Sequence, residues 1–254
     1  MSEYIEVFER TEIKYLLPHE QFIKLQEFLV NYARIDDYGK TRIHNIYFDT
    51  PDYKLIRTSL DKPVYKEKLR LRTYGDTNDF TNSFIEIKKK YKGIVYKRRV
   101  SGTYKKAYDY LVKDGHPLDD SQISREIESF RNMYGELRPV MNISYDRIAM
   151  VGIDDPNFRV TFDTNIEWTT DKPDLRRETG GRQILKDGEY LMEIKVANSM
   201  PMSLARRLSE LRIFPTSFSK YGRAYTDMTG TKGMVYSMEP DMASRYEREV
   251  IAYA

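Results

Sequence analysis

The chain of 254 residues contains no cysteine and only three histidines. The absence of cysteine excludes disulfides, thiolate zinc sites and cysteine nucleophiles. No H-E-x-x-H motif occurs, so the sequence does not favour a metal site built from histidine. The pattern G-x-x-x-x-G-K-[ST] is also missing, so any phosphate-binding site must be built without a P-loop.

Long apolar runs are missing as well. No stretch of about 18 apolar residues is present, and the opening residues MSEYIEVFER lack the apolar segment of a signal peptide. We therefore expect a soluble, cytoplasmic protein that does not insert into a membrane by itself. The net charge is only +3, so a strongly electropositive site would have to come from the arrangement of its residues.

Apolar alternation and turn residues predict seven or eight strands with helices between them. The expected strands span about 4–17, 43–52, 64–74, 82–91, 94–101, 138–151, 157–168 and 190–197. The expected helices span 18–33, 52–60, 103–134 in two pieces, 203–213 and 219–228. This order favours an α+β fold, an antiparallel β-barrel with flanking helices. We expect residues 1–230 to form this domain and residues 231–254 to form a helical C-terminal extension.

The stretch KEKLRLRTYG, residues 66–75, places basic residues at alternate positions with leucines between them. Side chains alternate between the two faces of a strand, so one face carries cations and the other carries leucine. The pattern recurs in FIEIKK, YKRRV, FRVTFDTN and LMEIKV. The cations on these faces, with one from a later helix, are Arg10, Lys14, Lys68, Arg70, Arg72, Lys88, Lys97, Arg99, Arg147, Arg159, Lys195 and Lys220.

An amphipathic strand taken alone usually just turns its charges to solvent. The bias in sign argues against that reading here, because the collected faces hold twelve of the 42 Lys and Arg residues and only four of the 39 Asp and Glu residues. The four acids are Glu12, Glu86, Asp163 and Glu193. Cations crowded in this way are stable where a polyanion offsets their repulsion. We therefore expect a barrel whose polar, cationic lumen forms a tunnel and whose apolar exterior is covered by helices.

Eight stretches follow one another in the order FERTEIKYLL, IYFDTPD, KLRLRTYG, FIEIKKKYKGIVYKRRV, RPVMNISYDRIAM, FRVTFDTNIEW, YLMEIKV and FSKYGRAYTDM. Together they resemble the catalytic domain of the vacuolar transporter chaperone (VTC) polyphosphate polymerases. That family belongs to the triphosphate tunnel metalloenzymes, which are related to CYTH domains. The resemblance spans about residues 8–228. It implies transfer of the ATP γ-phosphate to a growing inorganic polyphosphate chain inside a basic tunnel, with Mn²⁺ or Mg²⁺ as cofactor.

The resemblance also implies roles for single residues. The expected catalytic residues are Arg70, Arg72, Lys88, Arg147, Arg159 and Lys220. The expected substrate-binding residues are Arg10, Lys14, Lys68, Lys97, Arg99 and Lys195. Glu193 is the expected metal ligand, with Glu12 and Glu86 as weaker candidates. Tyr47, Asp49, Tyr145 and Asp163 are further candidates, Asp49 as a turn cap and Asp163 as a residue that orients an arginine.

One position departs from the family pattern. Triphosphatases of the CYTH group carry E-x-E-x-K on the first strand, where this chain has Arg10, Glu12 and Lys14. This difference favours a polymerase over a tripolyphosphate or nucleoside triphosphate hydrolase, which stays the alternative together with a non-catalytic polyphosphate-binding module. No basic helix suggests a nucleic-acid partner. The membrane helices of eukaryotic relatives are not seen, so coupling to a membrane would need a partner protein.

Overall fold

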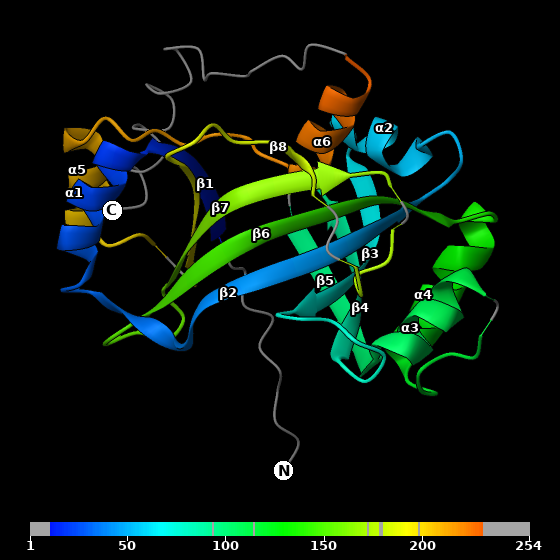
Figure 1. Cartoon of the computed structure of the whole chain (residues 1–254). Helices are drawn as coiled ribbons and strands as arrows, with labels where there is room; N and C mark the ends of the chain where they lie inside the picture. Colours follow the sequence, from blue (N-terminus) through cyan, green and yellow to red (C-terminus); the bar gives the residue numbers. More distant parts are fainter. Residues whose placement is uncertain are drawn as a thin grey trace.

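The computed structural model describes residues 11–92, 94–113, 115–171, 173–177, 180–197 and 199–230. Within them, nine strands form one antiparallel sheet and six helices flank it (Figure 1). The strands are β1 (Thr11–Pro18), β2 (Ala33–Asp49), β3 (Tyr65–Tyr74), β4 (Asn82–Tyr91), β5 (Ile94–Thr103), β6 (Arg138–Gly152), β7 (Arg159–Thr169), β8 (Arg182–Gln183) and β9 (Glu189–Val196). The helices are α1 (His19–Leu29), α2 (Lys54–Leu60), α3 (Tyr104–Val112), α4 (Gln122–Tyr134), α5 (Met202–Glu210) and α6 (Lys220–Met228).

The strand order is β1-β9-β7-β6-β2-β3-β4-β5, with β8 paired to β7. The sheet is strongly curved, so that it has a concave and a convex face (Figure 1). The α+β class, the antiparallel sheet and the flanking helices are confirmed. Within the described residues, however, the edge strands β1 and β5 do not pair with each other, so the sheet is not closed and the expectation of a closed barrel is wrong.

Four helices cover the convex face, because alternate residues of the strands present an apolar surface there. Leu25 of α1 and Leu204 of α5 share one apolar cluster with strands β1, β7 and β9. Leu111 of α3 and Phe130 of α4 share a second cluster with Leu69 of β3. Figure 1 shows these two helix pairs at opposite ends of the sheet.

Helix α6 lies on the other side of the sheet. Tyr221 and Ala224 belong to an apolar cluster with Tyr47 and Ile143, and the Tyr221 ring stacks on Tyr47 with 4.5 Å between centroids. Tyr47 pairs in register with Arg70, so both side chains point to the concave face. The expected position of the helices, outside the tunnel, is therefore wrong for α6, which packs inside the curve of the sheet.

Several boundaries differ from the sequence prediction. Strand β2 starts at Ala33, ten residues before the predicted start, and the two-residue strand β8 lies in a segment predicted to be loop. Both are polar segments, and apolar periodicity cannot detect a strand without a buried face. Arg10 and the predicted C-terminal extension, residues 231–254, lie outside the described residues.

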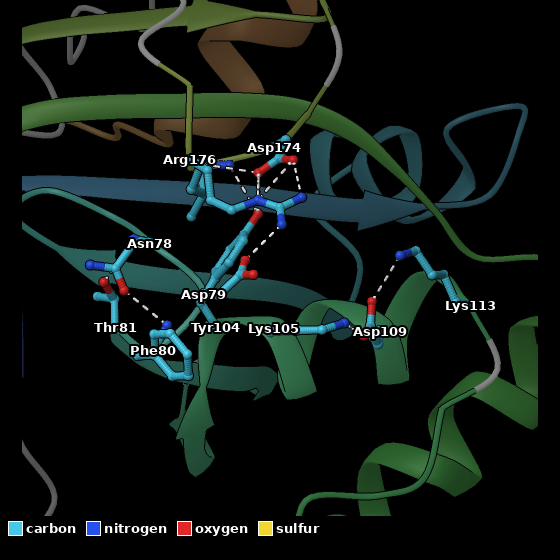
Figure 2. Close-up of polar contacts among 11 residues, drawn as sticks. Asn78, Asp79, Phe80, Thr81, Tyr104, Lys105, Asp109, Lys113, Asp174 and Arg176 are labelled. Atoms are coloured by element: carbon cyan, nitrogen blue, oxygen red, sulfur yellow. Dashed lines mark hydrogen bonds and ion pairs between the residues drawn. The ribbon is translucent and has the colours of Figure 1, made fainter.

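The polar segment before β8 is tied to the rest of the molecule by Arg176, which Figure 2 shows between two carboxylates. Its guanidinium pairs with Asp174 at 2.5 Å and with Asp79 of the β3–β4 loop at 2.7 Å. The Tyr104 hydroxyl donates to Asp174 and accepts from the backbone N–H of Leu175. A loop that reads as irregular in the sequence is thus held against the start of α3.

Candidate functional site

The predicted charged side chains of the described strands lie on the concave face. The register shows this directly, because Arg70 pairs with Tyr47 on one side and with Glu86 on the other, and Glu86 pairs with Arg99. Across the other half of the sheet, Thr161 pairs with Glu193, which in turn pairs with Lys14. Residues opposite each other in register share a face. The structure therefore brings together Glu12, Lys14, Lys68, Arg70, Arg72, Glu86, Lys88, Lys97, Arg99, Arg147, Arg159, Asp163, Glu193 and Lys195.

Glu86 is the centre of one charge cluster. Its carboxylate is 1 % exposed and lies 2.6 Å from Arg70, 2.5 Å from Lys97 and 3.8 Å from Arg72. Burial alone would raise the pKa of Glu86, but Arg70, Arg72 and Lys97 together lower it well below its usual range. Because its oxygens face three cations, Glu86 is better suited to orient the two arginines than to bind a metal ion.

Asp163 is the centre of a second cluster. The Arg147 guanidinium donates to both carboxylate oxygens, at 2.6 and 2.8 Å, and Lys220 of α6 donates at 2.5 Å. Burial disfavours the charged form of Asp163, but Lys220 and Arg147 outweigh it and lower the pKa of the carboxyl. The expected orienting role of Asp163 is confirmed by these contacts, and α6 contributes a cation to the same face.

Lys14 lies between the two carboxylates that are candidate metal ligands. Its ammonium group is 3.2 Å from Glu12 and 3.8 Å from Glu193, and Glu193 also pairs with Lys195 at 2.8 Å. Burial favours the neutral amine of Lys14, but Glu193 and Glu12 raise its pKa above the usual value. Burial likewise opposes ionisation of Glu193, and Lys195 and Lys14 reverse this, so that its pKa is lowered.

Two lysines on this face, Lys68 and Lys88, have pKa values below the usual range of lysine. Burial lowers the pKa of Lys68 to about 7, and the charges of Lys88 and Lys66 add to the effect. Burial also lowers the pKa of Lys88 to about 8, although Glu12 at 3.9 Å acts in the opposite direction. The ammonium group of Lys68 donates to the Ser219 hydroxyl, which caps α6, at 2.9 Å. A bound anion would favour the charged form of both lysines, because no nearby carboxylate does so fully.

Polar side chains without charge fix the two central arginines. Arg72 donates to Asn45 at 2.8 Å and to the Tyr145 hydroxyl at 3.0 Å, while Arg70 donates to the Tyr47 hydroxyl at 3.3 Å. Burial opposes ionisation of Tyr145, but Arg72, Arg147 and Lys220 lower its pKa to about 8.

Asn45 was missed by the sequence reasoning. Its alternation with Tyr47 in HNIYFD is the signal that could have placed it on the charged face.

The remaining predicted residues are less tightly held. The Arg99 guanidinium lies over the Phe84 ring, 4.8 Å from its centroid, and Arg159 is exposed beside Lys195 in the register. Within the described part of the chain, neither arginine forms an ion pair. Thr161 lies on the same face as Arg159 and Asp163, as the alternation in FRVTFDTN predicts, but it was not among the predicted site residues. It is 9 % exposed, and in the described structure its hydroxyl has no hydrogen-bond partner.

Asp49 caps α2, and its carboxylate does not contact the described basic residues of the concave face. Its carboxylate accepts hydrogen bonds from the backbone N–H groups of Leu55 and Ile56 and from the Tyr221 hydroxyl. Burial raises its pKa in spite of these donors. The interpretation of Asp49 as a cap is confirmed, and its bond to Tyr221 connects α2 with α6.

Glu12 and Glu193 are suited to hold a divalent metal ion whose other ligands come from the substrate. The described residues contain no group of three or more histidine or carboxylate side chains placed to hold a metal. Mg²⁺ in phosphate-binding sites usually takes only one or two carboxylates, and phosphate oxygens and water complete the shell. Two partly exposed carboxylates on the adjacent strands β1 and β9 match that requirement.

The fold of the chain also occurs in solved structures of other proteins. A search of curated protein sequences finds no match. Among solved structures, a candidate adenylate cyclase from Bacillus halodurans is 15 % identical, with a TM-score of 0.50, over 83 % of this chain and 95 % of that one. A Hippeastrum protein described as a candidate adenylyl cyclase with a dominant triphosphatase activity is 16 % identical, with a TM-score of 0.52, over 89 % of this chain and 98 % of that one.

These two structures share the fold of the chain. No helix in the described ranges is both long and apolar enough to cross a membrane. The VTC domain family matches residues 9–229, which include every predicted site residue. The chain therefore belongs to the VTC domain family.

Proposed function

We propose that this protein is a polyphosphate polymerase that transfers the γ-phosphate of ATP to the end of an inorganic polyphosphate chain. The observation that carries the proposal is the concave face itself, on which basic side chains from seven strands and from α6 surround a few buried carboxylates. Phosphoryl transfer depends mainly on positioning and on neutralising phosphate charge, so a site built almost only of fixed cations suits it.

The proposed reaction needs no protein nucleophile. A terminal oxygen of the polyphosphate chain attacks the γ-phosphorus of ATP, and a new P–O–P bond forms. The bond between that phosphorus and the β,γ-bridging oxygen breaks, its electrons stay on that oxygen, and ADP leaves. The chain grows by one phosphate for each ADP released.

The arginines would hold the phosphates that react. Arg70 and Arg72 are fixed through Glu86, Tyr47 and Asn45, so their planar guanidinium groups can grip phosphate oxygens in pairs without first losing side-chain freedom. Arg147 and Lys220, fixed by Asp163, would neutralise charge on the opposite side.

Lys68 and Lys88 would add point charge where no carboxylate fully neutralises them. Lys14, Lys97, Lys195, Arg99 and Arg159 would bind the remaining phosphates, and we expect the same of Arg10.

Glu193, with Glu12, would hold Mn²⁺ or Mg²⁺ on the concave face. Such an ion, when bound, supplies positive charge to phosphate oxygens and polarises the bond that breaks. We propose that Glu86 takes no part in metal binding, because its side chain is only 1 % exposed, whereas those of Glu193 and Glu12 are 12 % and 25 % exposed. We place the reaction in the cytoplasm, where ATP is available. We also propose that any coupling of the reaction to a membrane needs a membrane protein as partner.

The test is to incubate the purified protein with ATP and Mn²⁺ and to resolve the products on a gel stained for polyphosphate. A ladder of chains is expected from the unaltered protein. Glu193→Gln should reduce it by about 10²-fold or more, because the substitution removes a metal ligand without changing the shape of the side chain. Glu167→Gln is the matched control, since Glu167 pairs with Arg42 away from the concave cluster.

Two other results would contradict the proposal. Free phosphate without a ladder would indicate a hydrolase acting on tripolyphosphate or nucleoside triphosphates. Binding of polyphosphate with no turnover of ATP would indicate a non-catalytic binding module.

A further inference from the structure

One end of the β3–β4–β5 region carries apolar side chains that face solvent. Six of them are 40–62 % exposed, although residues of these types are normally buried. They are Val64, Tyr65, Tyr91, Ile94, Val95 and Tyr96. We call this group, with the lysines around it, the strand-end rim. Single exposed apolar residues need no explanation, but a contiguous group marks an interaction site.

The six residues are contiguous in space. Tyr65 pairs in register with Tyr91, and Tyr91 pairs with Ile94 across the β4–β5 hairpin. The backbone N–H of Lys92 donates to the carbonyl of Val64, which joins the hairpin to the start of β3. The rim is therefore one surface made by the ends of three neighbouring strands.

Lysines surround this apolar surface. Within residues 60–66 and 89–96 the sequence has five lysines, no arginine and a single acid, Asp61. The adjacent Glu67 is 3 % exposed and accepts a hydrogen bond from the Tyr65 hydroxyl at 2.7 Å, so it adds little negative charge to the surface. The lysines are Lys62, Lys66, Lys89, Lys90 and Lys92. Lys66 and Lys90 pair in register and lie on the concave face next to Lys68 and Lys88, whereas Lys89 points to the other face. Burial and the nearby charges of Lys90 and Lys62 lower the pKa of Lys66, which shows how closely these cations are crowded.

The composition distinguishes between possible partners. Protein–protein interfaces are enriched in arginine and depleted in lysine, so five lysines without an arginine do not favour a protein. Aromatic and aliphatic side chains flanked by lysine are typical of surfaces that lie at the headgroup level of an anionic membrane. The charge of such a membrane is complementary to that of the rim.

The shape of the rim agrees with a flat partner. Successive residues of a strand point to opposite faces, and the exposed group includes neighbours such as Val64 and Tyr65, or Val95 and Tyr96. A partner that approaches the strands end-on contacts residues of both faces at once. We propose that the strand-end rim docks on the surface of anionic lipid membranes, inserting its apolar side chains among the headgroups.

The inference does not rest on the proposed enzymatic activity, and vesicle binding tests it. The full-length protein would be mixed with sedimentable vesicles of phosphatidylcholine alone, or of phosphatidylcholine mixed with phosphatidylglycerol. Binding is expected only to the anionic vesicles. Tyr91→Ser combined with Ile94→Ser, and separately Lys89→Glu combined with Lys92→Glu, should each weaken partitioning by about tenfold or more.

Matched controls distinguish binding through the strand-end rim from nonspecific binding to vesicles. Tyr38→Ser removes an aromatic side chain that is 83 % exposed on β2, and Lys24→Glu removes an exposed charge on α1. Both variants should bind like the unaltered protein, and thermal unfolding would verify that all variants fold.

Three results would overturn the inference. The first is absence of binding to anionic vesicles. The second is vesicle binding that is retained in the rim variants and is displaced by tripolyphosphate. Such a result would assign vesicle binding to the concave face. The third is a rim substitution that abolishes self-association while vesicle binding is unchanged, which would make the rim a protein interface.

Discussion

Each buried carboxylate on the concave face holds more than one cation. Glu86 contacts Arg70 and Lys97, and Asp163 contacts Arg147 and Lys220. A buried carboxylate with two cationic partners leaves a net positive charge that only an added anion can balance. The acids in this site therefore fix the directions of the basic groups without cancelling their charge.

Thr161 allows a test at the scale of one hydroxyl. Its oxygen has no hydrogen-bond partner among the described residues and lies opposite Glu193 in register. Thr161→Val should weaken tripolyphosphate binding by about tenfold, as expected for a lost hydrogen bond to a charged group. The same substitution should leave the free energy of unfolding unchanged or raise it, because it removes a buried, unsatisfied oxygen.

Calorimetric titration and thermal unfolding measure the two effects on the same samples. Thr161→Ser is the control, since it keeps the hydroxyl and should keep the affinity. Equal loss of binding in the serine variant would mean that the methyl group matters and not the oxygen.

The titrating groups of the site predict how binding depends on pH. Lys68, with a pKa of about 7, loses its positive charge as pH rises through that value, and Tyr145, with a pKa of about 8, gains a negative charge as pH rises further. Both changes disfavour an anionic ligand. Affinity for tripolyphosphate, measured without metal, should therefore fall as pH increases from about 6.5 to 8.5.

Two variants separate the contributions. Lys68→Arg cannot lose its charge in this range, so the lower part of the decline should disappear. Tyr145→Phe should reduce the upper part of the decline, and the rest of it should come from Lys88, whose pKa is also about 8. A pH profile unchanged in both variants would show that neither group titrates near the ligand.

At the scale of elements, α6 is the part that the sequence placed least well. Its residues were correctly predicted as a helix, and Lys220 as a site residue. An amphipathic pattern, however, does not tell which surface of a curved sheet the helix covers. Gly222 helps to decide it, because a Cβ there would lie only 3.2 Å from the Leu60 side chain of α2. Such close helix packing depends on tertiary structure that no local pattern encodes.

The cap of α6 connects its stability with the site. The Ser219 hydroxyl accepts from the backbone N–H of Gly222 and from Lys68. Ser219→Ala should lower the free energy of unfolding by about 1 kcal/mol, which is typical for loss of a cap. It should also weaken tripolyphosphate binding, since both Lys68 and Lys220 depend on that end of the helix.

Ser121→Ala is a closely matched control, because Ser121 caps α4 through the backbone N–H of Ser124. Chemical denaturation should show a similar loss of stability in both variants, while only Ser219→Ala changes the affinity. If both variants bound equally well, α6 would not position the site.

At the scale of the whole molecule, the sequence predicted an antiparallel sheet, expected as a closed barrel, and the face that carries the charge. Period-two alternation reports which residues share a face, and it did so correctly for Lys68, Arg70 and Arg72. It does not report whether the last strand returns to the first, because closure depends on twist and on strand number. The open edges at β1 and β5 could be recognised only in three dimensions. The same holds for the Thr161 hydroxyl, which has no hydrogen-bond partner among the described residues.

The most direct test of the proposed function uses ATP labelled in its γ-phosphate and measures where the label goes. Polymerisation predicts that the label enters acid-insoluble chains and that one ADP is released for each phosphate incorporated, with little free phosphate. Release of the label as free phosphate, in equal amount to ADP and without labelled chains, would contradict a polymerase and identify a hydrolase built on the same cationic face.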